Sequence, residues 1–142
     1  MWADTLQQLE HQHLLRLMTL GGSSVLTGAL LLLVLPLRRI RAPLLSHFAT
    51  QCAVWGVAEL IWVAYAIRDI PLRDYDGAAS LAQLLWIAIG LEAGAILVGI
   101  TLAIGGWTHV KRPGVVGSGL GIAVQGAALM VLDLILVRAI RL

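Results

Sequence analysis

Charged residues are scarce in this sequence. Asp, Glu, Lys and Arg make up only 13% of the 142 residues, whereas 59% are hydrophobic. A typical soluble domain has about 25% charged and 45–50% apolar residues, so a soluble chain of this composition would expose much of its apolar surface to water. The composition excludes an ordinary soluble domain and indicates a protein solvated by lipid.

Other kinds of residue are scarce in an informative way. Cys52 is the only cysteine, so no disulfide can form within the chain. The glycines between Gly114 and Gly121 are not followed by the Lys-Ser/Thr of a phosphate-binding loop. No cluster of basic residues suits nucleic acid, and the sequence identifies no cofactor and no metal.

Four long apolar runs fill most of the chain, at about residues 17–37, 48–67, 82–105 and 114–137. Each has the roughly 20 residues that a helix needs to cross about 30 Å of hydrocarbon. Since little sequence remains between them, we expect a single all-α domain, residues 1–142. The predicted fold is an up-down bundle of four transmembrane helices.

Residues 2–17 precede the first run and have a helical pattern of their own. Leu6, Leu9, His13 and Leu17 recur at spacings of three and four, with polar residues between them. The segment is either a short amphipathic helix in the head-group region or an extension of the first span. His11 and His13 point to different helix faces, so we expect surface histidines rather than a metal site.

The second, third and fourth apolar runs each carry an ionisable or amide side chain near the same depth. Counting 1.5 Å per residue places Glu59, Glu92 and Gln125 near the middle of the second, third and fourth runs. Asp133 lies about 12 Å further along the fourth run, where Arg138 is a nearby partner. A charged group at such depth costs about 2.5–3.5 kcal/mol on insertion scales, so each needs a partner, water or a function.

The buried polar layer supports two interpretations. Glu59 and Glu92, protonated in part and hydrogen-bonded to each other or to Gln125, would bind protons or a cation, with Asp133 as a relay and Trp55 and Trp62 lining the site. Alternatively, the same groups only hold the helices together, which is a common use of polar residues in membranes. The sequence leaves both open.

Small residues recur on the same helix faces as the polar groups. Stripes of this kind run through Gly21, Ser24 and Gly28, through Ala88, Ala95 and Gly99, and through Gly117, Gly121 and Ala128. They predict close helix approach. The Gly90–Gly94 pair has GxxxG spacing and serves contacts either within the bundle or between protomers.

Several of these residues together resemble a family of small bacterial four-span proteins catalogued as a domain of unknown function. The resemblance rests on Phe48, Gln51, Trp55-Gly56 and Glu59, on Leu91-Glu92 and Gly99, and on Gly119-x-Gly121-x-Ala123-Val124-Gln125-Gly126 with Asp133. It covers the last three spans, about residues 46–138. This chain has Glu59 where the family pattern has Asn, Glu92 where it has Asp, and Ala95 in place of an aromatic residue. The resemblance implies architecture and supplies no activity.

The sequence therefore predicts a multi-pass protein of a bacterial cytoplasmic membrane. Four spans put both termini on one side, and the Arg38-Arg39-Ile40-Arg41 cluster favours the termini outside, although Lys and Arg are evenly divided between the two sides. We expect a homo-oligomer or part of a larger membrane complex, with lipid as the main partner. The second functional hypothesis is a non-catalytic accessory subunit of such a complex.

Overall fold

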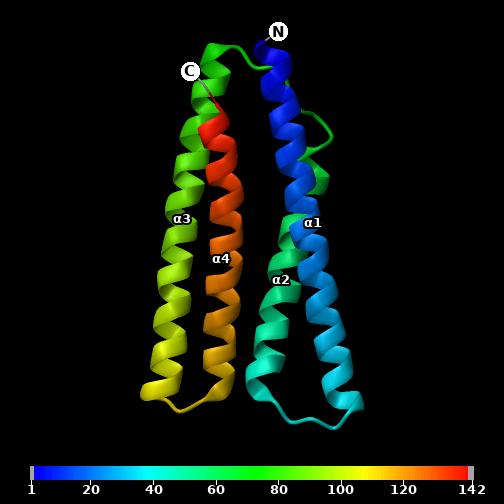
Figure 1. Ribbon diagram of the computed structural model, residues 1–142, viewed down its shortest axis with the longest axis vertical. Helices are drawn as coiled ribbons and strands as arrows, with labels where there is room; N and C mark the ends of the chain where they lie inside the picture. The colour runs from blue at the N-terminus through cyan, green and yellow to red at the C-terminus, as the bar shows by residue number, and fades with distance from the viewer. Residues whose placement is uncertain (1, 141–142) are drawn as a thin grey trace.

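The computed structural model describes residues 2–140, apart from the side chain of Trp2, and this part of the chain folds as four α-helices (Figure 1). They are α1 (Trp2–Leu37), α2 (Pro43–Ala66), α3 (Tyr75–Thr108) and α4 (Pro113–Ala139). All four are long and apolar enough to cross a membrane. The prediction of an all-α, four-span fold is confirmed.

Proline and aspartate side chains define where three of the helices begin. Pro43 and Pro113 occupy the first turn of α2 and α4, where the missing N–H has no helical partner to lose. Asp74 caps α3 by accepting a hydrogen bond from the Gly77 backbone N–H at 2.8 Å. Arg39 and Lys111, both with positive φ, allow the two tight connections that follow α1 and α3.

The segment before the first apolar run is an extension of the first span. α1 continues without a break for 36 residues, so residues 2–17 do not form a separate helix. Leu6, Glu10, His13, Leu14 and Leu17 are all buried, which places one face of this segment inside the protein. Burial of that face against the other helices explains why the segment stays with the bundle.

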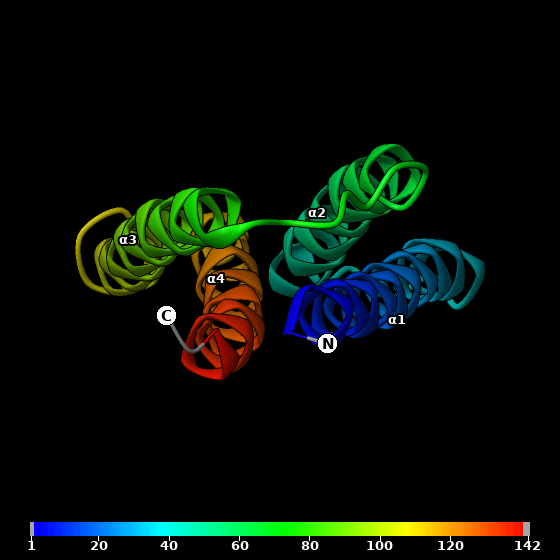
Figure 2. The same ribbon diagram turned by 90° about the horizontal axis from the view of Figure 1, so that it is seen from above.

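The helices pair as two hairpins, α1 with α2 and α3 with α4. Contacts between the hairpins are made by α4, which packs against α2 and, less extensively, against α1; α3 contacts α4 alone. Seen from above, α3 and α2 stand apart on one side of the molecule (Figure 2). The up-down order is as expected, but the bundle is open along the side between α2 and α3.

Glycines bring the helix backbones together at the points predicted from their spacing. A Cβ on Gly28 would lie 2.6 Å from the Ala49 carbonyl oxygen, and one on Gly99 would lie 2.6 Å from the Gly119 carbonyl oxygen. These contacts fix the crossing of α1 with α2 and of α3 with α4.

The Gly90–Gly94 pair is different. A Cβ at either position would have nothing within 4 Å. The pair therefore makes no contact within the protein and faces outward from α3.

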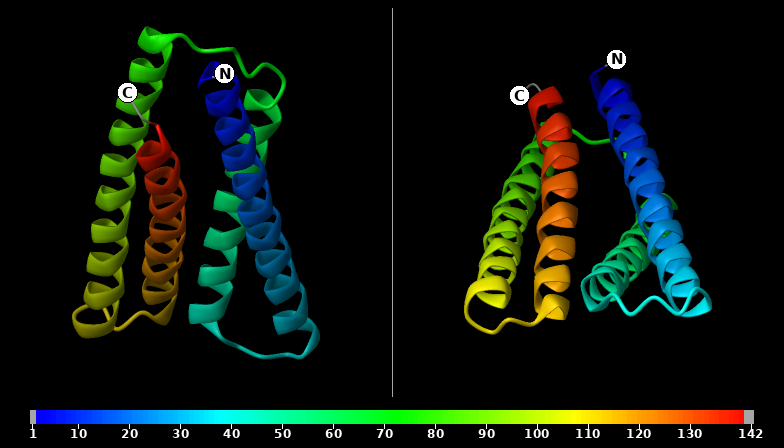
Figure 3. Two further views of the ribbon diagram at one scale, coloured as in Figure 1. Left: turned by 45° about the horizontal axis from the view of Figure 1, so that its top comes forward. Right: turned by 60° about the horizontal axis from the view of Figure 1, so that its bottom comes forward.

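The path of α4 explains the open side. Near its start, Gly114, Gly117 and Gly121 lie against His47, Leu44 and Gln51 of α2, whereas near its end Leu129 and Leu132 pack with a buried cluster of Leu14, Leu17 and Val63. Because Val63 belongs to α2, α4 packs on α2 near its start and on both α1 and α2 near its end. At the end where α1 begins and α4 finishes, only the loop of residues 67–74 bridges the space from α2 to α3 (Figure 3).

Candidate functional site

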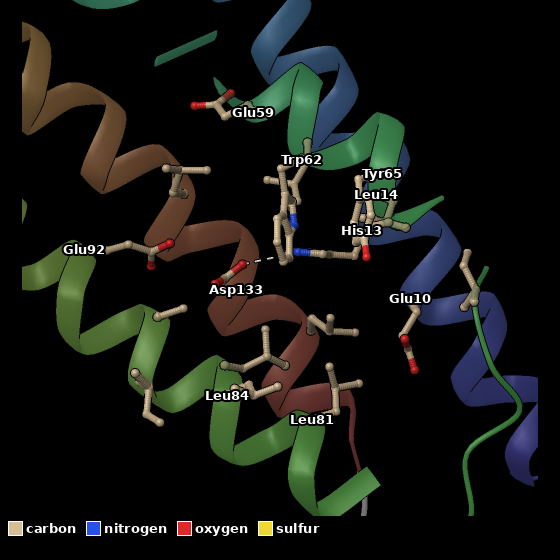
Figure 4. A pocket seen from close by; sticks show the side chains of 18 of the residues that line it. Glu10, His13, Leu14, Glu59, Trp62, Tyr65, Leu81, Leu84, Glu92 and Asp133 are labelled. Atoms are coloured by element: carbon tan, nitrogen blue, oxygen red, sulfur yellow. Dashed lines mark ion pairs between the residues drawn. The ribbon is translucent and has the colours of Figure 1, made fainter. Parts of the chain in front are cut away.

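A cleft of about 720 Å³ occupies the open side between α2 and α3. Residues from all four helices and from the α2–α3 loop line it, and most of them are apolar or aromatic (Figure 4). The titratable groups that line it are Glu10, His13, Glu59, Tyr65, Asp69, Arg73, Glu92 and Asp133. The cleft therefore combines an apolar body with an unusual number of ionisable side chains for a membrane-spanning protein.

The innermost polar contact joins the first and last helices. His13 Nε2 on α1 lies 3.2 Å from Asp133 Oδ1 on α4, and each side chain is only 10% exposed (Figure 4). The pair is an ion pair when His13 is protonated. This corrects two expectations: His13 is buried rather than on the surface, and the partner of Asp133 is His13 rather than Arg138.

Glu92 of the adjacent helix α3 lies beside this pair. Its side chain points toward Asp133, close enough for the two carboxyl groups to affect each other's charge (Figure 4). Its Oε2 atom is buried and has no hydrogen-bond partner. His13, Asp133 and Glu92 thus form one polar cluster contributed by α1, α4 and α3.

Glu59 of α2 lines the same cleft but stands apart from this cluster. The residue is 6% exposed, and neither of its carboxylate oxygens has a hydrogen-bond partner. Its Cβ packs against α1 beside Gly21. Trp55 and Trp62, which share its helix face, also line the cleft.

Gln125 is buried but faces a different partner. Its Nε2 donates a 2.9 Å hydrogen bond to Ser24 Oγ on α1, and the residue is 3% exposed. Since Glu59 has no partner, the predicted hydrogen bond between Glu59 and Glu92 or Gln125 is wrong. The reason is rotation about the helix axis: Gln125 lies on the side of α4 that faces α1 and does not line the cleft.

A second ion pair closes the end of the cleft nearest the loop. Arg73 donates from Nε to Glu10 Oε1 at 2.7 Å and from Nη2 to Glu10 Oε2 at 3.1 Å. Gln7 Nε2 donates to the Ile70 carbonyl oxygen at 2.7 Å. These bonds hold the α2–α3 loop against α1.

Glu10 and His13 were not identified from the sequence as members of a site. One signal was present, because Leu6, Leu9, His13 and Leu17 already placed His13 on an apolar helix face. The side chains that Glu10 and His13 contact could not be predicted from the sequence; Glu10 and Arg73, for example, are 63 residues apart. Within residues 2–140, no group of three or more His, Cys, Asp and Glu side chains is arranged to hold a metal ion.

Comparison with known proteins gives a family but no activity. A family described as a family of unknown function (DUF6992) matches residues 16–134, a range that includes the later part of α1, all of α2 and α3, and most of α4. No curated protein and no solved structure matches the chain.

Proposed function

This chain belongs to the family of unknown function DUF6992, and we propose from its geometry that it binds protons inside the membrane, at the His13–Asp133–Glu92 cluster. The observation that carries the proposal is the buried His13–Asp133 contact with Glu92 beside it. Histidine is the side chain whose charge most readily changes near neutral pH. Two carboxyl groups side by side also disfavour both being ionised, so the cluster favours holding a shared proton.

The cluster offers a short proton path. A proton that enters the cleft binds the Glu92 carboxylate; it passes to the Asp133 carboxylate and then to the imidazole of His13. Each donor returns to its unprotonated form as the next group becomes protonated, so no other reactant is needed. Asp133 acts as the relay in this path, and His13 carries the proton toward the end of the molecule where α1 begins.

A proton is a better candidate than a metal cation for this site. The oxygen-rich shell of six to eight ligands that binds Ca²⁺ has no counterpart in the cluster, and no metal-ligand grouping occurs in the described residues. Proton binding needs only the His13–Asp133 contact and the neighbouring Glu92 carboxyl group.

The test is a proton titration of the full-length protein in detergent or lipid nanodiscs. Infrared difference spectra between acidic and alkaline buffer report the carbonyl stretch of protonated carboxyl groups. We expect Asp133→Asn and Glu92→Gln to remove part of this signal, and Asp76→Asn, at an exposed residue of the first turn of α3, to leave the buried-carboxyl band unchanged. Identical difference bands in all three variants and the wild type would rule out the cluster as the proton site.

A second candidate function is that of an accessory subunit, in which the polar groups only stabilise the fold. It is favoured by α3, which contacts α4 alone and presents Gly90 and Gly94 outward, leaving a face on which another helix could pack closely. Gly94→Leu should then dissociate a homo-oligomer or complex isolated in mild detergent while the monomer stays folded. Gly105→Leu, another site with no neighbour within 4 Å, is the matched control.

The proposed location is a bacterial cytoplasmic membrane with both ends of the chain outside. The Arg38-Arg39-Ile40-Arg41 cluster at the opposite end of the molecule supports this orientation. In a Cys52→Ala background, an impermeant maleimide should label Arg68→Cys in intact cells. It should label Arg41→Cys only after the cells are permeabilised, and the reverse pattern contradicts the orientation.

A further inference from the structure

The cleft is open sideways, in the direction that hydrocarbon would occupy. Trp62 and Tyr65 on α2 are 62% and 75% exposed, and Leu84 and Leu91 on α3 are 63% and 71% exposed, although all four line the cleft. Because α2 and α3 make no contact with each other, a molecule dissolved in the bilayer can reach the interior without passing through water. The volume of about 720 Å³ lies in the range of small-molecule sites, about 300–1,000 Å³.

Glu59 is the polar group in the cleft that most clearly needs a partner. More than nine-tenths of the residue is buried, and both carboxylate oxygens have no hydrogen-bond partner. A buried carboxyl group without a partner is strongly disfavoured if it is ionised. A ligand that supplied positive charge would offset that cost.

The charges around the cleft favour a cation. The two basic side chains that line it already have carboxylate partners, since Arg73 is bound by Glu10 and His13 contacts Asp133. Three further acidic residues line the cleft and have no such basic partner, namely Glu59, Asp69 and Glu92. The lining therefore has three more carboxyl groups than basic side chains, and no described basic side chain of the lining is left to pair with them.

The aromatic side chains favour the same kind of ligand. Trp55, Trp62 and Tyr65 line the cleft from the helix that carries Glu59. The face of an aromatic ring attracts an organic cation, and Trp does so most strongly. An inorganic ion would gain little from these rings and from the apolar surface around them.

We propose that the cleft binds a lipophilic organic cation, an ammonium or phosphonium centre carried on apolar groups, with Glu59 as the counter-ion and Trp62 as the aromatic contact. Such a molecule partitions into the bilayer, enters between α2 and α3, and places its charge beside Glu59 while its apolar groups contact the leucines of α3. The proposal shares the cleft with the proposed proton site but depends on Glu59, which is not part of the His13–Asp133–Glu92 cluster. Each can therefore fail while the other holds.

The test uses radiolabelled tetraphenylphosphonium and the full-length protein purified in mild detergent. Tetraphenylborate, nearly the same shape with the opposite charge, is the matched control ligand. In equilibrium dialysis we expect the protein to bind the cation at least about tenfold more tightly than the anion. Glu59→Gln, which keeps the side-chain shape and removes the charge, should weaken cation binding about tenfold and should abolish the preference over the anion.

Control variants separate this site from other sources of binding. Asp76→Asn also removes one carboxylate but lies outside the cleft lining, and Trp86→Leu removes a Trp of α3 that does not line the cleft. We expect both to bind the cation like the wild type, and Trp62→Leu to bind it at least about threefold more weakly. All variants should elute like the wild type in size-exclusion chromatography, which excludes misfolding as the cause.

Two outcomes overturn the proposal. Equal affinity for cation and anion means that the cleft is an apolar site that a lipid chain fills. Cation binding that is the same in Glu59→Gln as in Asp76→Asn means that Glu59 is not the counter-ion. Neither outcome affects the proton titration of Asp133 and Glu92, and a failed titration leaves the dialysis result unchanged.

Discussion

His13 Nε2 and Asp133 Oδ1 lie 3.2 Å apart and join the first helix to the last. The contact holds α4 against α1 toward the end of the molecule where α1 begins and α4 finishes. Both residues line the cleft, so the contact fixes the position of α1 and α4 there and also forms part of the polar cluster. Removing either partner leaves the other buried without its principal contact.

We expect His13→Ala to lower the free energy of unfolding by about 1.5–3 kcal/mol, the range for hydrogen bonds to charged groups. His11→Ala, at an exposed position two residues earlier, should change it by less than about 0.5 kcal/mol. Unfolding in a denaturing detergent measures both. A double-mutant cycle with Asp133→Ala should give a coupling energy of about 1 kcal/mol or more; additive effects would show that the contact contributes no stability.

Gly28→Ala tests the crossing of α1 with α2. The added Cβ would lie 2.6 Å from the Ala49 carbonyl oxygen and 2.7 Å from the Ala53 nitrogen, so the backbones must move apart. We expect a loss of about 1–3 kcal/mol in the free energy of unfolding. Gly22→Ala, where a Cβ meets nothing within 4 Å, should be neutral or stabilising by up to about 1 kcal/mol because alanine is the better helix former. Equal effects of the two substitutions would contradict this crossing.

Arg73→Lys tests the contact that holds the α2–α3 loop. Lysine keeps the positive charge but cannot make the two parallel hydrogen bonds of the guanidinium group to Glu10. We expect faster amide hydrogen exchange in residues 68–74 and a loss of about 1 kcal/mol in stability. Arg68→Lys, in the same loop but exposed, should leave the exchange unchanged. Protection that is unaltered in Arg73→Lys would mean that the loop is held by other contacts.

Gln125→Met tests the assignment of Gln125 as an interhelical bond outside the cleft. The substitution removes the donor to Ser24 and should cost about 0.6–2 kcal/mol of stability. Because Gln125 does not line the cleft, we expect tetraphenylphosphonium binding to remain within about twofold of the wild type. A loss of cation binding comparable to that of Glu59→Gln would show that Gln125 contributes to the cation site.

The position of each polar group along its helix could be predicted from the sequence because this position follows from counting residues. A rise of 1.5 Å per residue and runs of about 20 apolar residues are enough to define four spans and to place Glu59, Glu92 and Gln125 deep inside them. Glycine spacing likewise predicted where helices approach closely, at Gly28 and Gly99. These properties are local, so each helix could be analysed without knowledge of the others.

The partners of these groups were decided only by tertiary structure. Which way a side chain faces depends on how helices cross, and the crossings depend on contacts such as Gly28 with Ala49 and Gly99 with Gly119. As a result, Gln125 bonds Ser24, a residue 101 positions away. Glu59, at a similar depth, is left without a partner in the cleft. The sequence determined that polar groups lie within the apolar helices; the packing of α4 against α1 determined which of them meet.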